Sequence, residues 1–261
     1  IRLIVRITSL NMNGIRAAAR KGFFEWLPEH NADVICLQET RVQDHQMTKV
    51  MQEPPGLHAI YHHAEKPGYS GVAIYSKEEP DHVQVGLGWD ELDCEGRFLQ
   101  ADFGNLSVVS LYLPSGSAKD ERQTFKYTVM ERFEEWLKEK RKAKRDVVVC
   151  GDWNIAHTKK DIKNWRGNQK NSGFLPEERE WMTKVFGDLD WRDVFRGLHP
   201  EAEGDGYTWW SNRGQAWANN TGWRIDYQVA TPGLAAKAKA ASVWRESRFS
   251  DHAPLIVDYN P

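Results

Sequence analysis

Short apolar runs alternate with polar turns along most of the chain, and this pattern predicts a protein rich in β-strands. Most of the runs end at Gly, Asn, Asp or Ser, the residues that turns favour. The expected strands are 2–10, 33–37, 58–63, 71–75, 83–86, 98–103, 106–113, 146–150, 224–230, 242–244 and 255–258.

Helical spacing or a helix start signal marks four further segments, namely 15–26, 120–142, 176–186 and a short turn at 191–195. In the longest of them, Phe125, Val129 and Phe133 recur on one helix face. Pro176 suits a first helical turn, and two glutamates follow it at the positive end of the helix dipole. Many strands with a few long helices predict two packed sheets covered by helices.

Composition places the chain among ordinary globular proteins. It has 261 residues, of which 40% are hydrophobic and 28% charged. We expect one domain over residues 1–261, because neither a linker nor an internal repeat is visible. The chain lacks an apolar run of about 20 residues, so we expect no membrane span. Three cysteines at scattered positions indicate reduced thiols and a cytoplasmic protein.

Five polar clusters each follow or end an apolar run, at 11–14, 38–40, 151–154, 226–227 and 250–252. Taken singly, each reads most simply as a set of turn residues. Together they carry acids, amides and one histidine, and strand ends present such side chains to a common cleft. Carboxylate and amide oxygens are ligands of hard divalent cations, and these groups also activate water.

Charge and aromatic residues hint at a polyanion partner. The net charge is only −2, but basic residues gather at 138–145 and at 159–170. We interpret the first run as a solvated helix end. The second follows the 151–154 cluster, so it is the better candidate for contacts to phosphates. Six of the twelve tryptophans lie between residues 181 and 223, either in the core or on a nucleic-acid surface. Trp209 and Trp210 should face opposite ways if they share a strand.

The polar clusters belong to a longer set of motifs that spans the chain in order. The set resembles the exonuclease III branch of the endonuclease/exonuclease/phosphatase family, the bacterial class II AP (apurinic/apyrimidinic) endonucleases. The matching motifs are 10–16 (LNMNGIR), 37–40 (LQET), 68–76 (GYSGVAIYS), 95–97 (EGR), 111–116 (LYLPSG), 151–157 (GDWNIAH), 171–179 (NSGFLPEER), 207–211 (YTWWS), 222–227 (GWRIDY) and 249–255 (FSDHAPL).

This resemblance implies an α/β fold, a four-layered α/β sandwich in which two packed mixed β-sheets are flanked by helices, as in DNase I. It implies Mg²⁺ or Mn²⁺ as cofactor. The implied substrate is double-stranded DNA with abasic sites or blocked 3′ ends, which such enzymes incise 5′ of the abasic site or trim from the 3′ end in base excision repair. A monomer in the cytoplasm, associated with the nucleoid, is expected.

The resemblance also assigns roles residue by residue. Glu39 matches the main metal ligand. Asp152 matches the acid that activates the attacking water, and Asn154 the amide that holds this water or the phosphate. Asp226 matches the carboxylate that orients His252 at the scissile phosphate. The other residues expected at the site are Asn11, Asn13 and Asp251 near the metal, where Asp152, Asn154 and His252 are also placed, and Tyr112 at the leaving group.

A third group is expected to bind DNA. The resemblance implies that Trp209, Trp210 and Trp223 form a pocket for the abasic sugar. Further contacts to DNA are expected from Arg97, Asn171, Lys163 and Lys170.

Two alternatives stay open. Phosphatases of inositol lipids and sphingomyelin hydrolases share the Asn, Glu, Gly-Asp-x-Asn and Ser-Asp-His pieces, but they lack the 171–179 and Trp-Trp-Ser motifs found here. A non-catalytic DNA-binding protein on the same fold should have lost one of the catalytic residues. Glu39, Asp152, Asn154, Asp226 and His252 are all present.

Overall fold

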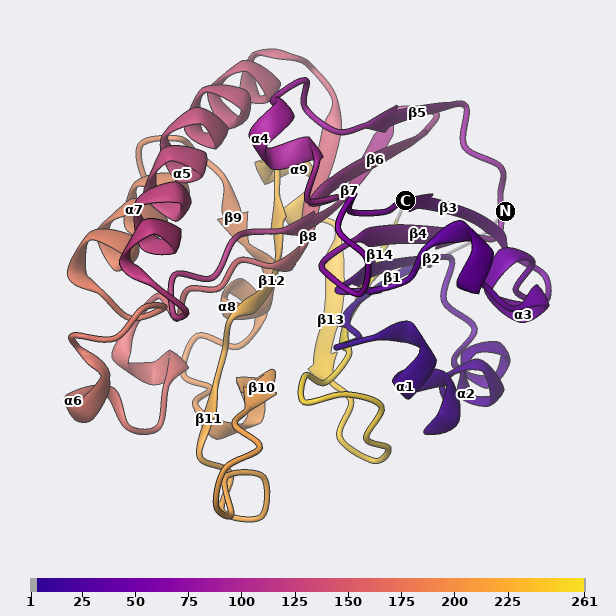
Figure 1. The fold of residues 1–261 in the computed structure, drawn as a ribbon. Helices are drawn as coiled ribbons and strands as arrows, with labels where there is room; N and C mark the ends of the chain where they lie inside the picture. The colour runs from indigo at the N-terminus through magenta and orange to yellow at the C-terminus, as the bar shows by residue number, and fades with distance from the viewer. Residues whose placement is uncertain (1–3, 261) are drawn as a thin grey trace.

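Two six-stranded β-sheets lie face to face in the computed structural model, which describes residues 4–260 (Figure 1). In the first sheet, β1 and β2 are parallel and the other neighbours are antiparallel. Its strand order is β13 (Ala238–Val243), β14 (Leu255–Tyr259), β1 (Val5–Asn11), β2 (Val34–Gln38), β4 (Val72–Ser76) and β3 (His58–His62).

The second sheet is also mixed, with β7 and β8 as its parallel pair. Its strand order is β5 (His82–Val85), β6 (Phe98–Phe103), β7 (Leu106–Tyr112), β8 (Asp146–Asp152), β12 (Asp226–Ala230) and β9 (Arg192–Asp193). A separate two-stranded ribbon pairs β10 (Trp209–Trp210) with β11 (Gly222–Trp223).

Helices cover the outer face of each sheet (Figure 1). On the second sheet lie α5 (Asp120–Lys142) and α7 (Pro176–Phe186), and on the first lie α1 (Ile15–Arg20), α2 (Phe23–His30) and α3 (Lys49–Gln52). The remaining short helices are α4 (Asp90–Asp93), α6 (Trp165–Asn168), α8 (Val194–Leu198) and α9 (Pro232–Ala235), with single 3₁₀ turns at η1 (Asp44–Gln46), η2 (Lys159–Asp161) and η3 (Gly204–Gly206).

Three apolar layers hold this arrangement together. Between the sheets, buried residues such as Ile7, Cys36 and Val148 come from both inner faces. A second layer packs α5 and α7 on one sheet, and a third packs α1 and α2 on the other. Apolar burial of this extent is the main force that stabilises a fold. The expected four-layered sandwich is therefore confirmed.

Several element boundaries differ from the sequence-based expectation. The helix expected over 15–26 is two helices, because Gly22 adopts a φ of 89° between them and lies in the left-handed region. The second of these helices continues through Pro28 to His30. The expected strand 242–244 overlaps the end of the longer β13, which stops at Val243, and residues 192–195 of the expected turn are divided between β9 and α8. The expected strand 2–10 begins outside the described residues, which include it from Ile4 onward.

No helix within residues 4–260 is both long enough and apolar enough to cross a membrane. The longest, α5, carries charged side chains along most of its 23 residues.

The strand register brings three polar side chains to the same edge of the second sheet. Asp152, at the end of β8, lies opposite Tyr112 of β7 on one side and Asp226 of β12 on the other. In the first sheet, β1 and β2 end together at Asn11 and Gln38. The polar ends of both sheets thus meet at one place, although they come from distant parts of the chain.

Candidate active site

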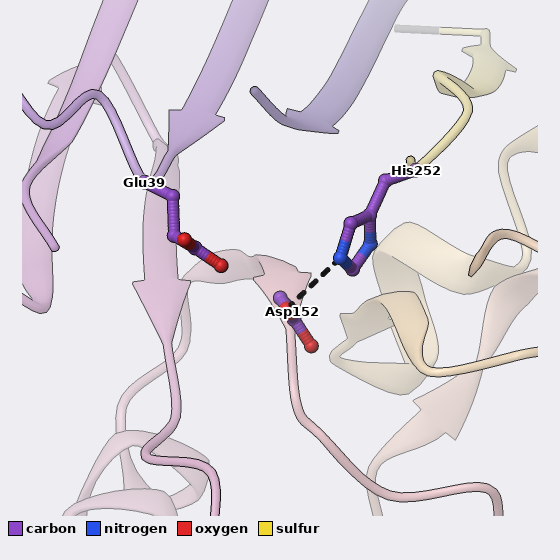
Figure 2. Close-up of side chains that lie close together, drawn as sticks. All are labelled: Glu39, Asp152 and His252. Atoms are coloured by element: carbon purple, nitrogen blue, oxygen red, sulfur yellow. Dashed lines mark ion pairs between the residues drawn. The ribbon is translucent and has the colours of Figure 1, made fainter. Parts of the chain in front are cut away.

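Glu39, Asp152 and His252 converge at this edge (Figure 2). Each offers one ligand atom, and the three atoms lie within 4.8 Å of one another. Glu39 directly follows β2, Asp152 ends β8, and His252 precedes β14. The chemistry of this donor set, two carboxylates and an imidazole, fits a divalent cation.

Asn11 and Tyr112 hold the two carboxylates in place. The Asn11 amide nitrogen donates to Glu39 Oε1 and to Asp152 Oδ2, both at 2.9 Å. The Tyr112 hydroxyl donates to the same Glu39 oxygen at 2.7 Å. The carbonyl oxygen of the buried Asn11 side chain accepts from the backbone nitrogen of Asn13. This arrangement fits a role for Asn11 in ordering the carboxylates.

His252 lies between two acids. Its Nδ1 is 2.8 Å from Asp226 Oδ2, and its Nε2 is 3.7 Å from Asp152 Oδ2. All three side chains are buried. The Thr208 hydroxyl accepts from the backbone nitrogens of Ile225 and Asp226, which fixes the start of β12. A histidine held by a carboxylate in this way has a fixed ring orientation.

The mutual burial of these groups shifts their pKa values. Burial raises the pKa of Asp152, and the negative charges of Asp226 and Glu39 raise it further against the opposing effect of His252. Burial lowers the pKa of His252, but the carboxylates of Asp226 and Asp152 outweigh it and raise the pKa overall. His252 is therefore a cation at neutral pH, and Asp152 binds a proton more readily than an ordinary carboxylate does.

Four non-glycine residues that line the cleft adopt left-handed backbone conformations: Asn13 with φ 46°, Glu39 with φ 49°, Arg41 with φ 51° and Asn154 with φ 53°. Asparagine tolerates this region, whereas for glutamate and arginine it costs energy that the surrounding structure must offset. The Asn154 backbone nitrogen donates to Asp152 Oδ1 at 2.9 Å, and its side-chain amide donates to the Leu113 carbonyl at 2.6 Å. Such backbone conformations concentrate at functional sites.

A cleft of about 740 Å³ opens over this cluster. One of its walls is aromatic, since the Trp209 and Trp223 rings meet edge to face at 5.8 Å and Ile225 lies beside them. The Trp209 indole donates to Asp251 Oδ2. The expected site residues that line the cleft are Asn13, Glu39, Tyr112, Asp152, Asn154, Asn171, Trp209, Trp223, Asp251 and His252.

Two residues expected at the DNA surface are buried elsewhere. Trp210 is 0% exposed, donates to Asn220 and packs on Trp217. It faces away from Trp209, as neighbours in a strand should, and this alternation keeps it out of the pocket. Arg97 is also buried: its guanidinium pairs with Glu95 and lies 4.6 Å from the Tyr112 ring centroid. The expectation that Trp210 and Arg97 contact DNA is therefore wrong for this conformation.

Lys163 and Lys170 are exposed and lie outside the cleft lining. The backbone nitrogen of Lys163 donates to Gly222, next to Trp223, and Lys170 directly precedes Asn171. Both therefore belong to segments at the rim of the cleft.

Sequence reasoning missed several cleft residues. Arg41 donates to Glu39 Oε2 at 2.5 Å, and its position two residues after Glu39 in a tight turn was the available signal. Ile225 could have been found because it lies between Trp223 and Asp226 in one motif. Ser172 could have been found in the same way, because it lies in the 171–179 motif, whereas Arg213 lies in a polar loop just after the 207–211 motif.

Comparisons with known proteins show the family and the fold of the chain. A sequence model of the endonuclease/exonuclease/phosphatase family matches residues 8–252. The chain is 40% identical to the exodeoxyribonuclease of Bacillus subtilis (strain 168) over 98% of its own length and 100% of that protein. It is 36% identical to the DNA repair nuclease APEX1 of Danio rerio over 97% of its own length and 81% of that protein. Its structure superposes on that of an AP endonuclease from Archaeoglobus fulgidus with a TM-score of 0.89 and 29% sequence identity. The superposition covers 98% of this chain and 100% of that chain.

Proposed function

The chain belongs to the endonuclease/exonuclease/phosphatase family and, within it, to the exonuclease III and AP endonuclease branch, and from this membership we propose that its cleft incises DNA at abasic sites. It is a hydrolase, a DNA repair nuclease of the exodeoxyribonuclease III and AP endonuclease type. The reaction is hydrolysis of the phosphodiester bond 5′ of the abasic site, together with trimming of 3′ ends. The observation that carries this proposal is the cluster of the partly buried Glu39 with the buried Asp152 and His252 beneath an aromatic wall.

The cluster suits attack of water on a phosphodiester. Asp152 accepts the proton of the attacking water, because its raised pKa brings it closer to neutrality, where a general base works best. His252 carries a positive charge that stabilises the charge developing on the phosphate oxygens. We propose that Asn154 holds the water or the phosphate and that Tyr112, which also lines the cleft, contacts the phosphate near the leaving group.

We also propose that the site uses Mg²⁺ or Mn²⁺. Glu39 is its main ligand, Asp152 offers a further carboxylate oxygen, and Asn13 and Asp251 also line the cleft. His252 contributes its positive charge and is not counted among the ligands, because a protonated imidazole cannot bind a metal. A bound divalent cation supplies Lewis acidity and lowers the pKa of a coordinated water. Asn11 and Asn154 act here by orienting carboxylates and water.

The aromatic wall accounts for the choice of substrate. Trp209, Trp223 and Ile225 form a pocket for the sugar of an abasic nucleotide that has turned out of the duplex. A nucleotide that keeps its base is too large for such a pocket, and turning an abasic nucleotide out of the duplex costs little because its stacking is already lost.

We further propose that residues 1–261 act as one domain and as a monomer on double-stranded DNA, in the cytoplasm at the nucleoid.

We expect the purified protein to incise a duplex that carries one abasic-site analogue, with Mg²⁺ present, and to stop when EDTA is added. Cleavage is measured on a denaturing gel with the 5′-labelled strand, and an undamaged duplex of the same sequence is the matched control. An inositol phosphate and sphingomyelin are tested in parallel. Hydrolysis of either of these without incision of the abasic duplex would assign the cleft to another substrate class.

A second expectation concerns the rim. We propose that Lys163 and Lys170 contact backbone phosphates. Lys163→Ala and Lys170→Ala should then weaken binding to all duplexes alike and should flatten the plot of log affinity against log salt concentration by about one unit per lost contact. Lys144→Ala is the matched control, because this exposed lysine lies in the 138–145 run, which we interpret as a solvated helix end. An unchanged slope in both rim variants would assign the phosphate contacts to other residues.

A further inference from the structure

An ion pair with no access to solvent lies beneath the segment that contains Asn154, directly after β8. This segment is called the catalytic loop below. Lys126 of α5 and Glu178 of α7 form a salt bridge, and both side chains are 0% exposed. The other buried side chains of α5 are mostly apolar and face the sheet. A fully buried lysine is rare, and it persists only where its charge and its hydrogen bonds are satisfied.

Lys126 has a second partner in the catalytic loop. Its Nζ donates to the backbone carbonyl of Asn154 at 2.7 Å. Asn154 is one of the residues with a left-handed backbone, and its own nitrogen atoms already donate hydrogen bonds to Asp152 and to Leu113. Lys126 thus adds a third hydrogen bond to Asn154, through its backbone carbonyl. The side-chain amide of Asn154 is the group that we place at the phosphate or the attacking water.

Glu178 also binds the part of the cleft lining formed by residues 171–173, here called the 171–173 wall. Its Oε1 accepts from the backbone nitrogens of Gly173 at 2.7 Å and Leu175 at 3.0 Å. The Gly173 carbonyl in turn accepts from Ala156 at 2.8 Å. Gly173 has a φ of 94°, and a Cβ atom there would come within 3.0 Å of the Trp223 ring and 3.3 Å of the Asn154 carbonyl oxygen. The wall therefore packs directly on both the pocket and the catalytic loop.

We propose that the Lys126–Glu178 pair is a positioning device that locks Asn154 and the 171–173 wall together, and so fixes the phosphate-holding amide relative to the sugar pocket. This inference rests on the proposed function. It also gives a physical reason for the 171–179 motif: Glu178 within it binds back to Gly173 and reaches across to the catalytic loop through Lys126.

Two variants separate positioning from stability. Glu178→Gln leaves an unpaired buried lysine, which strongly destabilises a protein, but Lys126 can still donate to Asn154. The double variant Lys126→Met/Glu178→Gln removes both buried charges at similar volume and should regain stability. The side-chain carbonyl of the introduced glutamine can still accept from Gly173 and Leu175. What the double variant lacks is the donor to the Asn154 carbonyl.

We expect the double variant to melt at a higher temperature than Glu178→Gln and yet to have the lower kcat on the abasic duplex. Its kcat should fall about tenfold to a hundredfold relative to wild type, with KM little changed, because a small misplacement of a catalytic group costs this much. Both constants are measured below the melting temperature of every variant. If kcat instead rises with the melting temperature, so that the double variant is more active than Glu178→Gln, the inference is overturned. The ion pair would then contribute to stability only.

The control is a partly exposed ion pair away from the cleft whose cation also donates to a backbone carbonyl. Arg6 pairs with Asp258 at 2.8 Å and also donates to the His30 carbonyl at 3.1 Å. Arg6→Met/Asp258→Asn should leave kcat unchanged, and an equal fall of kcat in this control would also overturn the inference. Failure of the wild-type protein to incise the abasic duplex would instead contradict the proposed function. Wild-type incision with full activity in the Lys126→Met/Glu178→Gln variant would contradict the positioning role alone.

Discussion

Asp152→Asn should lower the turnover of abasic-site incision by about a hundredfold to ten-thousandfold, the usual cost of losing a general base. The substitution keeps the size of the side chain, but Asn11 and the Asn154 backbone nitrogen donate to different oxygens of Asp152, so one of these two hydrogen bonds is lost with the charge. The introduced amide cannot accept the proton of the attacking water, whereas the residues that we propose to contact DNA are unchanged, so DNA binding should be retained. Single-turnover incision with excess protein gives the rate, and fluorescence anisotropy of labelled duplex gives the affinity.

The same strand provides a matched control for this prediction. Asp146 stands at the other end of β8 and pairs with Lys237 on the surface. Asp146→Asn is the same chemical change in the same element, and we expect wild-type turnover from it. Near wild-type turnover in Asp152→Asn would remove Asp152 from the role of base and would point to another group for activation of water.

The second large effect concerns His252 and Asp226 as a coupled pair. His252→Gln and Asp226→Asn should each lower the turnover by about a hundredfold. The double variant should lose little more than the more damaged single variant, because residues that act as a unit are not additive. The reason is geometric: Asp226 contacts His252 Nδ1 at 2.8 Å, so either substitution removes the oriented cation beside Asp152.

A double-mutant cycle on kcat/KM measures this coupling. Independent contributions, in which the two losses multiply, would contradict the pair. His30→Gln is the control, since His30 at the end of α2 is also buried and hydrogen-bonded, in its case to Thr8. It should change stability without changing the turnover of the folded protein.

The chemistry of the site could be read from the sequence because it sits where apolar runs end. Glu39 and Asp152 each follow a run of buried residues, so their motifs were visible as polar clusters after strands. The register that sets Asp152 opposite Asp226 was not visible, because pairing between distant strands leaves no local signal. The raised pKa of Asp152 follows from this register, so it could be predicted only from the structure.

The burial of particular polar and aromatic side chains was harder to predict from the sequence. Trp209 and Trp210 are identical in type and adjacent, and the alternation of a strand puts only the first in the cleft. Arg97 and Lys126 look like surface cations in sequence, yet both are buried by partners far along the chain, such as Tyr112 and Glu178. The strands β9, β10 and β11 have two residues each, too few for any periodicity to be recognised.

The meeting of both sheets at the active site has a consequence for the synthesis of the protein. Asn11 lies at the end of β1, whereas His252 precedes β14, which enters the first sheet between β13 and β1. A growing chain on the ribosome therefore carries most of this core before it carries His252, and the edge of β1 that faces β14 stays unpaired until β14 is made. We expect nuclease activity to appear only after β14 pairs with β1, because that step completes the first sheet and the catalytic cluster together.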